Sequence, residues 1–229
     1  MIVFLLLTTE KGNSYQLICE VMEASAPDFA LAHGFPMNMI SVVDDKFYVA
    51  NPTEMIVKKK YNGLLLKQRY KVKDVNGKLL LQVDGPSLSI HKKRVMRDAQ
   101  GSPILIMQEK VKMVSLRHRW TVHRGKSSDD KNVIFGVKRS HPMDMKPRLD
   151  VFMPGNTDED VSNFQVVGSH IQKSCTIYKG DTIIAQVSDV FPSRNFSKWK
   201  ESYKVKINEG VDYAFVMALL VILTVNDYI

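Results

Sequence analysis

Residues 213–225 read YAFVMALLVILTV, and this stretch decides the fold because it is apolar on every side. A helix that is apolar all round must be buried in protein or in lipid. Its 13 residues rise about 20 Å as a helix, whereas a membrane-spanning helix needs about 20 residues. We therefore predict a helix buried in the protein and no integral membrane span. The side chains expected at its centre are Tyr213, Phe215, Met217, Leu219, Leu220 and Ile222.

The residues just before this stretch indicate how the helix begins. Asn208 is a residue type that favours helix N-caps. Glu209 and Asp212 follow it, and their carboxylates would complement the positive end of the helix dipole. We therefore predict that this polar segment supplies the cap.

Upstream of the helix, from Lys46 to Ile207, short β-branched or apolar runs alternate with turn residues. The turns Asp74-Val75-Asn76-Gly77 and Asp98-Ala99-Gln100-Gly101 share one pattern, in which the Asp bonds its own backbone and the Gly takes a positive φ. Tyr178-Lys179-Gly180-Asp181 is a third predicted turn. About a dozen strands at this spacing predict an antiparallel sandwich or barrel and not βαβ units.

The helix and the strands together favour a barrel. A barrel of about eight strands fills its interior with side chains, but one of about twelve leaves a hole. Strands of about six residues are about 20 Å long, which matches the helix. We therefore predict a mainly β fold, an antiparallel β-barrel of about twelve strands that encloses a hydrophobic C-terminal α-helix.

The domain organisation follows from this pattern. We assign residues 41–229 to one barrel domain and residues 1–40, which show little periodicity, to a poorly ordered leader. Met1–Leu7 is apolar, but no basic region precedes it and no small-residue cleavage site follows, so secretion is the weaker interpretation. Cys19 and Cys175 make no disulfide framework, and a reducing compartment is expected. Cys175 lies in a strand-like run and is expected to be a buried free thiol.

Basic residues are concentrated in one part of the chain. The formal net charge is +8, and residues 58–126 hold 18 Lys and Arg against 4 Asp and Glu. This asymmetry points to nucleic acid, an acidic membrane surface or an acidic protein as partner, or else to a basic half that pairs with the acidic half. Because several of these residues fall in neighbouring predicted strands, they can converge on one outer face. The predicted anionic-ligand face contains Lys58, Lys60, Lys92, Lys93, Arg94, Arg117, Arg119 and Arg124.

The sequence holds no recognisable catalytic or metal-binding motif. Its 6 histidines show no H-E-x-x-H or zinc-finger spacing, and no G-x-S-x-G or P-loop pattern occurs. Asp74-Val75-Asn76-Gly77 resembles part of a calcium loop, but a hairpin turn explains it better. Strand alternation places His118 and Trp120 on a core face, with Arg117 and Arg119 outward. We predict a protein that is not an enzyme, with no cofactor and no metal.

Four collinear stretches of the chain resemble one family of plant proteins. They are IHKKRVMRDAQGSPI at 90–104, LRHRWTVHRG at 116–125, SCTIYKG at 174–180 and VDYAFVMALLVIL at 211–223. In order and spacing they are similar to the LURP-one-related proteins, and the resemblance covers about residues 44–223. Residues 1–28 and the residues after Leu223 depart from the family pattern, which leaves the packing of the C-terminal end open.

The resemblance implies a tubby C-terminal-like fold, a twelve-stranded barrel around a hydrophobic C-terminal helix. Members of the family are similar in fold to phospholipid scramblases and to tubby proteins, which are membrane-tethered transcription factors that bind phosphoinositides. Some members are linked to basal defence in plants. Because the family has no agreed biochemical activity, the resemblance bears on the fold more than on the function.

We therefore expect a non-enzymatic module that binds anionic phospholipid, phosphoinositides included. Its expected place is the cytoplasm or the inner face of the plasma membrane, with the nucleus as a further location. The alternatives are nucleic-acid binding through the same face and a protein-interaction scaffold, and lipid scrambling ranks last. Four basic residues at an anionic membrane contribute about 4 kcal/mol, which is only millimolar binding. Useful affinity therefore needs a shaped headgroup pocket or a second contact.

Overall fold

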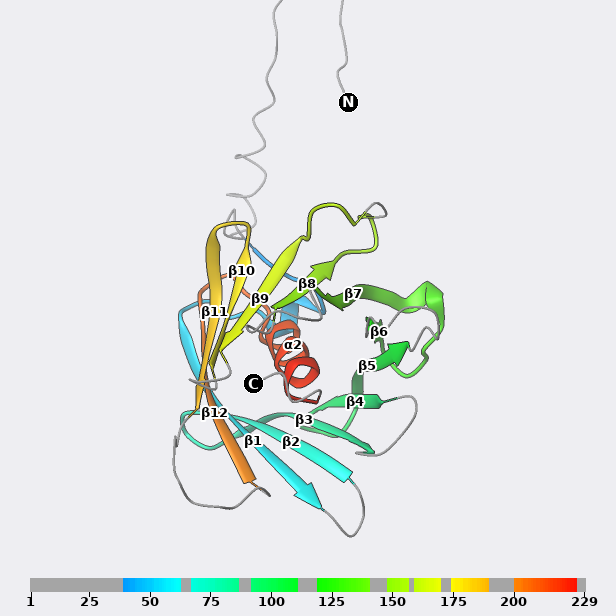
Figure 1. Ribbon diagram of the computed structural model, residues 1–229. Helices are drawn as coiled ribbons and strands as arrows, with labels where there is room; N and C mark the ends of the chain where they lie inside the picture. Colours follow the sequence, from blue (N-terminus) through cyan, green and yellow to red (C-terminus); the bar gives the residue numbers. More distant parts are fainter. Residues whose placement is uncertain are drawn as a thin grey trace, which may run out of the picture. The chain divides into compact units, whose positions relative to one another are not determined.

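The computed structural model describes residues 39–62, 67–86, 92–110, 119–140, 148–156, 159–169, 174–189 and 200–225. These residues form a closed barrel of twelve strands with one helix inside it (Figure 1). The strands are β1 (Thr53–Asn62), β2 (Lys67–Asp74), β3 (Leu79–Pro86), β4 (Lys93–Asp98), β5 (Pro103–Lys110), β6 (Arg119–Arg124), β7 (Val133–Arg139), β8 (Arg148–Phe152), β9 (Phe164–Ser169), β10 (Ser174–Lys179), β11 (Thr182–Asp189) and β12 (Lys200–Ile207).

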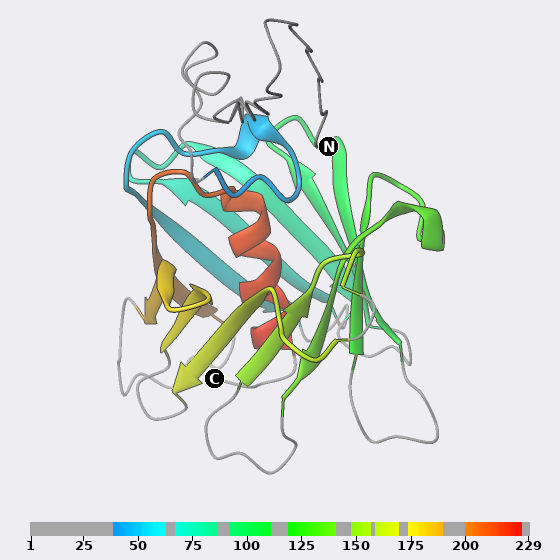
Figure 2. The same cartoon turned by 90° about the horizontal axis from the view of Figure 1, so that it is seen from above.

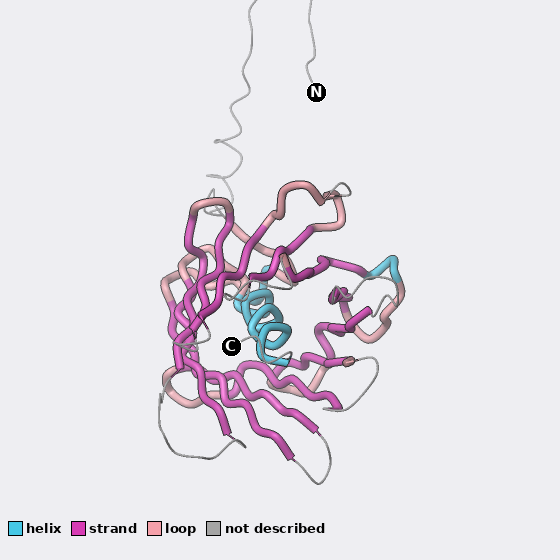
Figure 3. The backbone as a smooth tube through the Cα atoms, in the orientation of Figure 1, coloured by secondary structure: helices cyan, strands magenta, loops and turns pink. Residues whose placement is uncertain are grey.

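Each strand pairs antiparallel with the next one in the chain, and β1 pairs with β12 to close the ring (Figure 3). Two short 3-10 helices, η1 (Asp45–Phe47) and η2 (Asp130–Asn132), precede β1 and β7. A closed ring leaves no strand edge open to pair with another chain. The predicted fold class, a mainly β antiparallel barrel of about twelve strands around a C-terminal helix, is confirmed.

The two related hairpin turns have the predicted geometry. In the β2–β3 turn, the Asp74 carboxylate accepts the Lys78 N–H over 2.8 Å, and Gly77 has a φ of 83°. The β4–β5 turn repeats this arrangement, with a backbone N–H donated to the Asp98 carboxylate over 2.8 Å and a φ of 89° at Gly101. The carboxylate fixes the turn while glycine tolerates the positive φ.

The apolar stretch forms α2 (Tyr213–Val225), which runs along the barrel interior (Figure 2). Every residue from Ala214 to Val225 is buried. The Phe215 ring lies 5.1 Å from the ring of Phe135 in β7 and 4.9 Å from that of Phe164 in β9. The burial predicted for the helix centre holds for Phe215, Met217, Leu219, Leu220 and Ile222.

Tyr213 differs from that prediction because it is only partly buried. It is the first residue of α2, so it lies where the chain enters the barrel. Its ring meets the ring of Phe47 in η1 edge-on, with 5.4 Å between the centroids. Tyr213 therefore joins the helix start to the segment before β1.

Asp212 caps the helix, and Asn208 does not. One carboxylate oxygen of the buried Asp212 accepts two backbone N–H groups of the first helical turn over 2.8 and 3.1 Å. The other oxygen accepts the Val43 N–H over 2.7 Å. The Asn208 side chain instead donates to the Ile183 carbonyl of β11 over 2.7 Å. One carboxylate thus holds both the helix and the segment that precedes β1.

Some of the remaining predictions concern residues that the structure describes, and others do not. Trp120 is 2% exposed within the core and Cys175 is a buried free thiol, as expected. Of the expected leader, residues 1–40, only the last two lie among the described residues, and Ile40 is buried in a bridge with Val211. Cys19 and His118 lie outside the described residues.

Candidate anionic-ligand surface

Side chains of β1 and β2 alternate between the barrel interior and solvent. In β1, Met55 and Val57 are buried, whereas Lys58 and Lys60 are exposed. The register places Lys58 opposite Lys71, and Lys60 opposite Arg69. Every second residue of β2 is an outward cation, namely Lys67, Arg69, Lys71 and Lys73. Two residues of the predicted face are therefore continued by a row of cations on β2 that sequence reasoning did not name.

Carboxylates pair with the cations at the borders of this surface. Arg69 Nε lies 2.8 Å from the Asp84 carboxylate of β3. Glu54 of β1 lies 2.8 Å from Lys204 Nζ and 3.6 Å from Lys206 Nζ of β12, and the hydrogen bond from Lys204 is the main cause that lowers the pKa of Glu54. Among the described residues, no ion pair engages the remaining lysines of β1 and β2 that point outward. We call them the lysine face: Lys58, Lys60, Lys67, Lys71 and Lys73.

Lys59, between two exposed lysines, points into the barrel and is 8% exposed. Its Nζ donates to the Thr224 carbonyl over 3.2 Å and lies 2.9 Å from the Glu201 carboxylate. The hydroxyl groups of Thr224 and Tyr70 lie 3.2 Å apart, and burial raises the pKa of Tyr70. A cation beside the last carbonyls stabilises the C-terminal end of a helix. Lys59 therefore holds α2 while its two neighbours belong to the surface.

Arg94 lies inside the barrel, which corrects the prediction that it belongs to the outer face. Its side chain is 0% exposed, its Nη2 donates to Gln68 Oε1 over 3.0 Å, and burial lowers its pKa. It passes over Gly85 of β3, where a Cβ would lie 2.5 Å from Arg94 Cδ. Because side chains alternate along a strand, the outward direction of Lys93 sends Arg94 inward. Lys93 itself is exposed.

Lys92 and Arg124 are also engaged away from the lysine face. Lys92 Nζ lies 3.7 Å from the carboxylate of Glu109, which is 2% exposed. The Arg124 guanidinium donates to the Val43 carbonyl, in the segment before β1 that Asp212 also holds. Arg124 is exposed at the end of β6, and its place on the anionic-ligand face stays a prediction. Arg117 lies outside the described residues.

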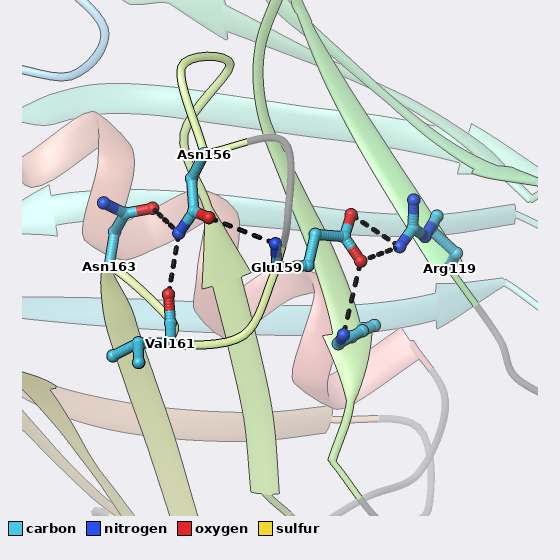
Figure 4. Close-up of polar contacts among 6 residues, drawn as sticks. Arg119, Asn156, Glu159, Val161 and Asn163 are labelled. Carbon is cyan, nitrogen blue, oxygen red and sulfur yellow. Dashed lines mark hydrogen bonds and ion pairs between the residues drawn. The ribbon is translucent and has the colours of Figure 1, made fainter.

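Arg119 is neutralised by an acid from the loop between β8 and β9 (Figure 4). The Glu159 carboxylate accepts hydrogen bonds from Arg119 Nη2 over 2.6 Å and from Lys138 Nζ over 3.3 Å. Asn156 holds the loop by accepting the Glu159 N–H over 3.2 Å. Burial acts to raise the pKa of Glu159, but the hydrogen bonds from Arg119 and Lys138 prevail and hold it below its ordinary value. The structure therefore does not join Arg119 to the lysine face.

A hollow of about 550 Å³ lies on the outer side of β4 and β5. We call it the β4–β5 hollow, and none of the residues that line it is acidic. Its cationic and apolar lining residues are Lys93, Val95, Arg97, Pro103, Ile106 and Lys126. Of the predicted face, only Lys93 belongs to it. Sequence reasoning missed Arg97 and Lys126 because they come together through a turn and a loop.

Two further features are absent from the described residues. No three His, Cys, Asp or Glu side chains in this part of the chain are grouped so that they could hold a metal ion. No described helix has the length and hydropathy needed to cross a membrane.

The fold and surface features described above define the class of protein. It is a closed twelve-stranded barrel with an apolar C-terminal helix inside and a basic outer face. Comparison with known proteins gives the family: the chain belongs to the LURP-one-related family, whose model matches residues 53–224. It is 38% identical to Protein LURP-one-related 15 of Arabidopsis thaliana over 184 residues, which cover 80% of this chain and 83% of that protein. It is 33% identical to Protein LURP1 of the same plant over 184 residues, covering 80% and 87%.

The fold comparison agrees with the sequence comparison. An X-ray structure of a protein from Arabidopsis thaliana aligns with a TM-score of 0.59 and 33% sequence identity. The alignment covers 80% of this chain and 96% of that chain. The resemblance read from the four sequence stretches is thus confirmed at the level of the family.

Proposed function

We propose that this protein is a non-enzymatic module that binds anionic phospholipid through the lysine face. The proposal rests on five outward lysines on two adjacent strands. None of these five lysines forms an ion pair with another described residue. Like charges opposite one another on neighbouring strands destabilise a sheet. Bound anions would remove that repulsion. The proposed place is the inner face of the plasma membrane, whose anionic lipids attract basic surfaces.

The expected strength is modest. Five lysines at about 1 kcal/mol each give a dissociation constant on the order of 0.2 mM. Long lysine stems let the ammonium groups reach a plane of phosphates while the strands stay rigid. The fold resemblance of LURP-one-related proteins to phosphoinositide-binding tubby proteins supports lipid as the anion. Binding of this kind is screened by salt, with a Debye length of about 8 Å at physiological ionic strength.

Flotation of the purified full chain with vesicles tests the proposal. One vesicle is pure phosphatidylcholine, and the other contains phosphatidylserine as well. We expect the chain to float only with the anionic vesicle and to dissociate as salt is raised. The double variant Lys58→Glu/Lys71→Glu reverses two charges that face each other in register, so its affinity should fall at least about 25-fold.

The matched control is the double variant Arg148→Glu/Lys179→Glu. Both residues are exposed but lie on β8 and β10, outside the lysine face, so binding should fall much less. Equal loss in the two double variants would mean that only net charge matters, and equal flotation with both vesicles would refute the proposal. Duplex DNA that binds more tightly than vesicles at physiological salt would favour nucleic acid instead.

A further inference from the structure

The β4–β5 hollow has an apolar floor although it lies outside the barrel. Val95 of β4 and Ile106 of β5 are opposite each other in register, and Ile106 is only 2% exposed. Residues 125–132 fold back on this side of the barrel. The Gly125 N–H donates to the Ile104 carbonyl over 2.7 Å, and a ring nitrogen of His123 lies 3.0 Å from the Asp129 carbonyl. This loop forms a wall that is fixed at two points.

Three cations surround this floor, and they come from different places in the fold. Lys93 begins β4, Arg97 lies near its end, and Lys126 belongs to residues 125–132. Arg97 Nη1 donates to the Gly101 carbonyl over 3.2 Å. That bond orients the guanidinium and uses one of its five N–H donors. An oriented guanidinium can bind a phosphate through two parallel hydrogen bonds.

Two acids next to these cations in the sequence are engaged elsewhere. The Asp98 carboxylate accepts a backbone N–H within the β4–β5 turn over 2.8 Å. The Asp130 carboxylate lies 2.9 Å from Lys110 Nζ. The hollow therefore gathers three positive charges with no acid in its lining. This charge pattern is typical of an anion-binding site.

We infer that the β4–β5 hollow binds a phosphomonoester carried on a carbon ring, such as a phosphorylated inositol headgroup. The hollow has a volume of about 550 Å³ and is open to solvent, so it has room for a group of that size. A phosphomonoester carries about −1.5 to −2 charges and three acceptor oxygens, which three cations can match. The phosphodiester of an ordinary phospholipid offers less charge and fewer terminal oxygens. The inference rests on the proposed function and adds a headgroup preference to it.

The hollow is connected to the lysine face by the strand register. Lys58 lies opposite Lys71, Lys71 opposite Gln82, and Gln82 opposite Arg97, along β1 to β4. No carboxylate interrupts this row. One surface therefore offers both non-selective attraction and three grouped cations for a doubly charged group, which would be the second contact that useful affinity requires.

Binding of the full chain to two anionic vesicles of equal surface charge tests the inference. One contains phosphatidylserine, and the other contains phosphatidylinositol bisphosphate. We expect tighter binding to the second at physiological salt. The double variant Arg97→Gln/Lys126→Gln should lose about fivefold per cation, or about 25-fold, on the bisphosphate vesicle and clearly less on the serine vesicle. The matched double variant Lys58→Gln/Lys71→Gln should weaken both by a similar factor.

The inference would be overturned if Arg97→Gln/Lys126→Gln weakened binding to both vesicles equally while the melting temperature stayed unchanged. Calorimetry with free inositol trisphosphate separates this outcome from failure of the proposed function. A wild-type chain that binds inositol trisphosphate but no vesicle would keep the hollow as a phosphomonoester site with a soluble ligand, and the double variant should abolish the heat of binding. No heat and no preference between vesicles would refute the site.

Discussion

Arg94 shows that the place of one residue depends on its strand neighbours more than on its own charge. A buried guanidinium is costly unless it is hydrogen-bonded. Here Gln68 accepts one of its hydrogen bonds, and Gly85 leaves room for its stem. A run of three basic residues would suggest a surface patch, but strand alternation divides Lys93 from Arg94. The same division separates Lys59 from Lys58 and Lys60.

Gly85→Ala tests this packing at the scale of one methyl group. The added Cβ would lie 2.4 Å from the Lys93 carbonyl oxygen and 2.5 Å from Arg94 Cδ. Because strand pairing holds the carbonyl, the chain must shift, and we expect the free energy of unfolding in urea to fall by about 1–3 kcal/mol. Gly155→Ala is the control, since its Cβ would meet nothing within 4 Å. Equal stability of the two variants would show that Arg94 can move at little cost.

Cys175 gives a pH dependence with a defined sign. Burial raises the pKa of its thiol from 9.0 to about 12. Below pH 9 the thiol is protonated in both folded and unfolded chains, so it changes nothing. Above pH 9 only the unfolded chain ionises, so stability is lost as pH rises toward 12, by up to about 4 kcal/mol. Urea unfolding at pH 8 and pH 10.5 should show a smaller loss for Cys175→Ala than for the natural chain, and identical losses would contradict this.

At the scale of elements, Asp212 joins α2 to the segment before β1 through one carboxylate. The carboxylate caps α2 and accepts the Val43 N–H, while the Asp212 backbone forms a β-bridge with Tyr48. A buried N–H group that loses its acceptor costs about 1–3 kcal/mol. We expect Asp212→Ala to lower the free energy of unfolding by about 2–4 kcal/mol, measured in urea. Asn208→Ala, which removes a single exposed hydrogen bond, should cost less than about 1 kcal/mol. If Asn208→Ala lowered the free energy of unfolding more than Asp212→Ala, Asn208 would be the more important capping residue.

The elements also show which parts of the site the sequence could predict. Lys67, Lys71 and Lys73 alternate with buried residues of β2, so period-two reasoning alone could have found them. The pairing of Glu54 with Lys204 could not be found in this way, because it depends on the β1–β12 closure between distant parts of the chain. Arg97 and Lys126 meet in the hollow because of a loop whose path no local pattern predicts.

At the scale of the whole molecule, the prediction was more complete. The apolar stretch is shorter than a membrane-spanning helix, and its lack of a polar face requires a cavity that surrounds it. A ring of about twelve strands supplies that cavity. These constraints are few and strong, whereas a surface site depends on many small choices of register. The fold was therefore predictable from residues 213–225 and the turn spacing, and the site was only partly so.

The same packing predicts that α2 stays in the barrel in the presence of anionic membranes. Twelve buried residues of the helix face the barrel lining. Each apolar side chain returned to water costs about 1.5–3 kcal/mol, so exposing the lining costs tens of kcal/mol. The lysine face offers only about 5 kcal/mol. We expect hydrogen exchange of residues 213–225 to be unchanged by anionic vesicles.

A variant with a destabilised helix provides the reference for that exchange measurement. Phe215→Ala removes a ring that packs against Phe135 and Phe164, which should cost about 3–5 kcal/mol and speed exchange in residues 213–225 without any lipid. If the natural chain showed such faster exchange only with vesicles, and in the strands that line the barrel as well, then lipid would be drawing the helix out. Lipid scrambling would then explain the protein better than peripheral binding, because only a helix that leaves the barrel can enter the bilayer.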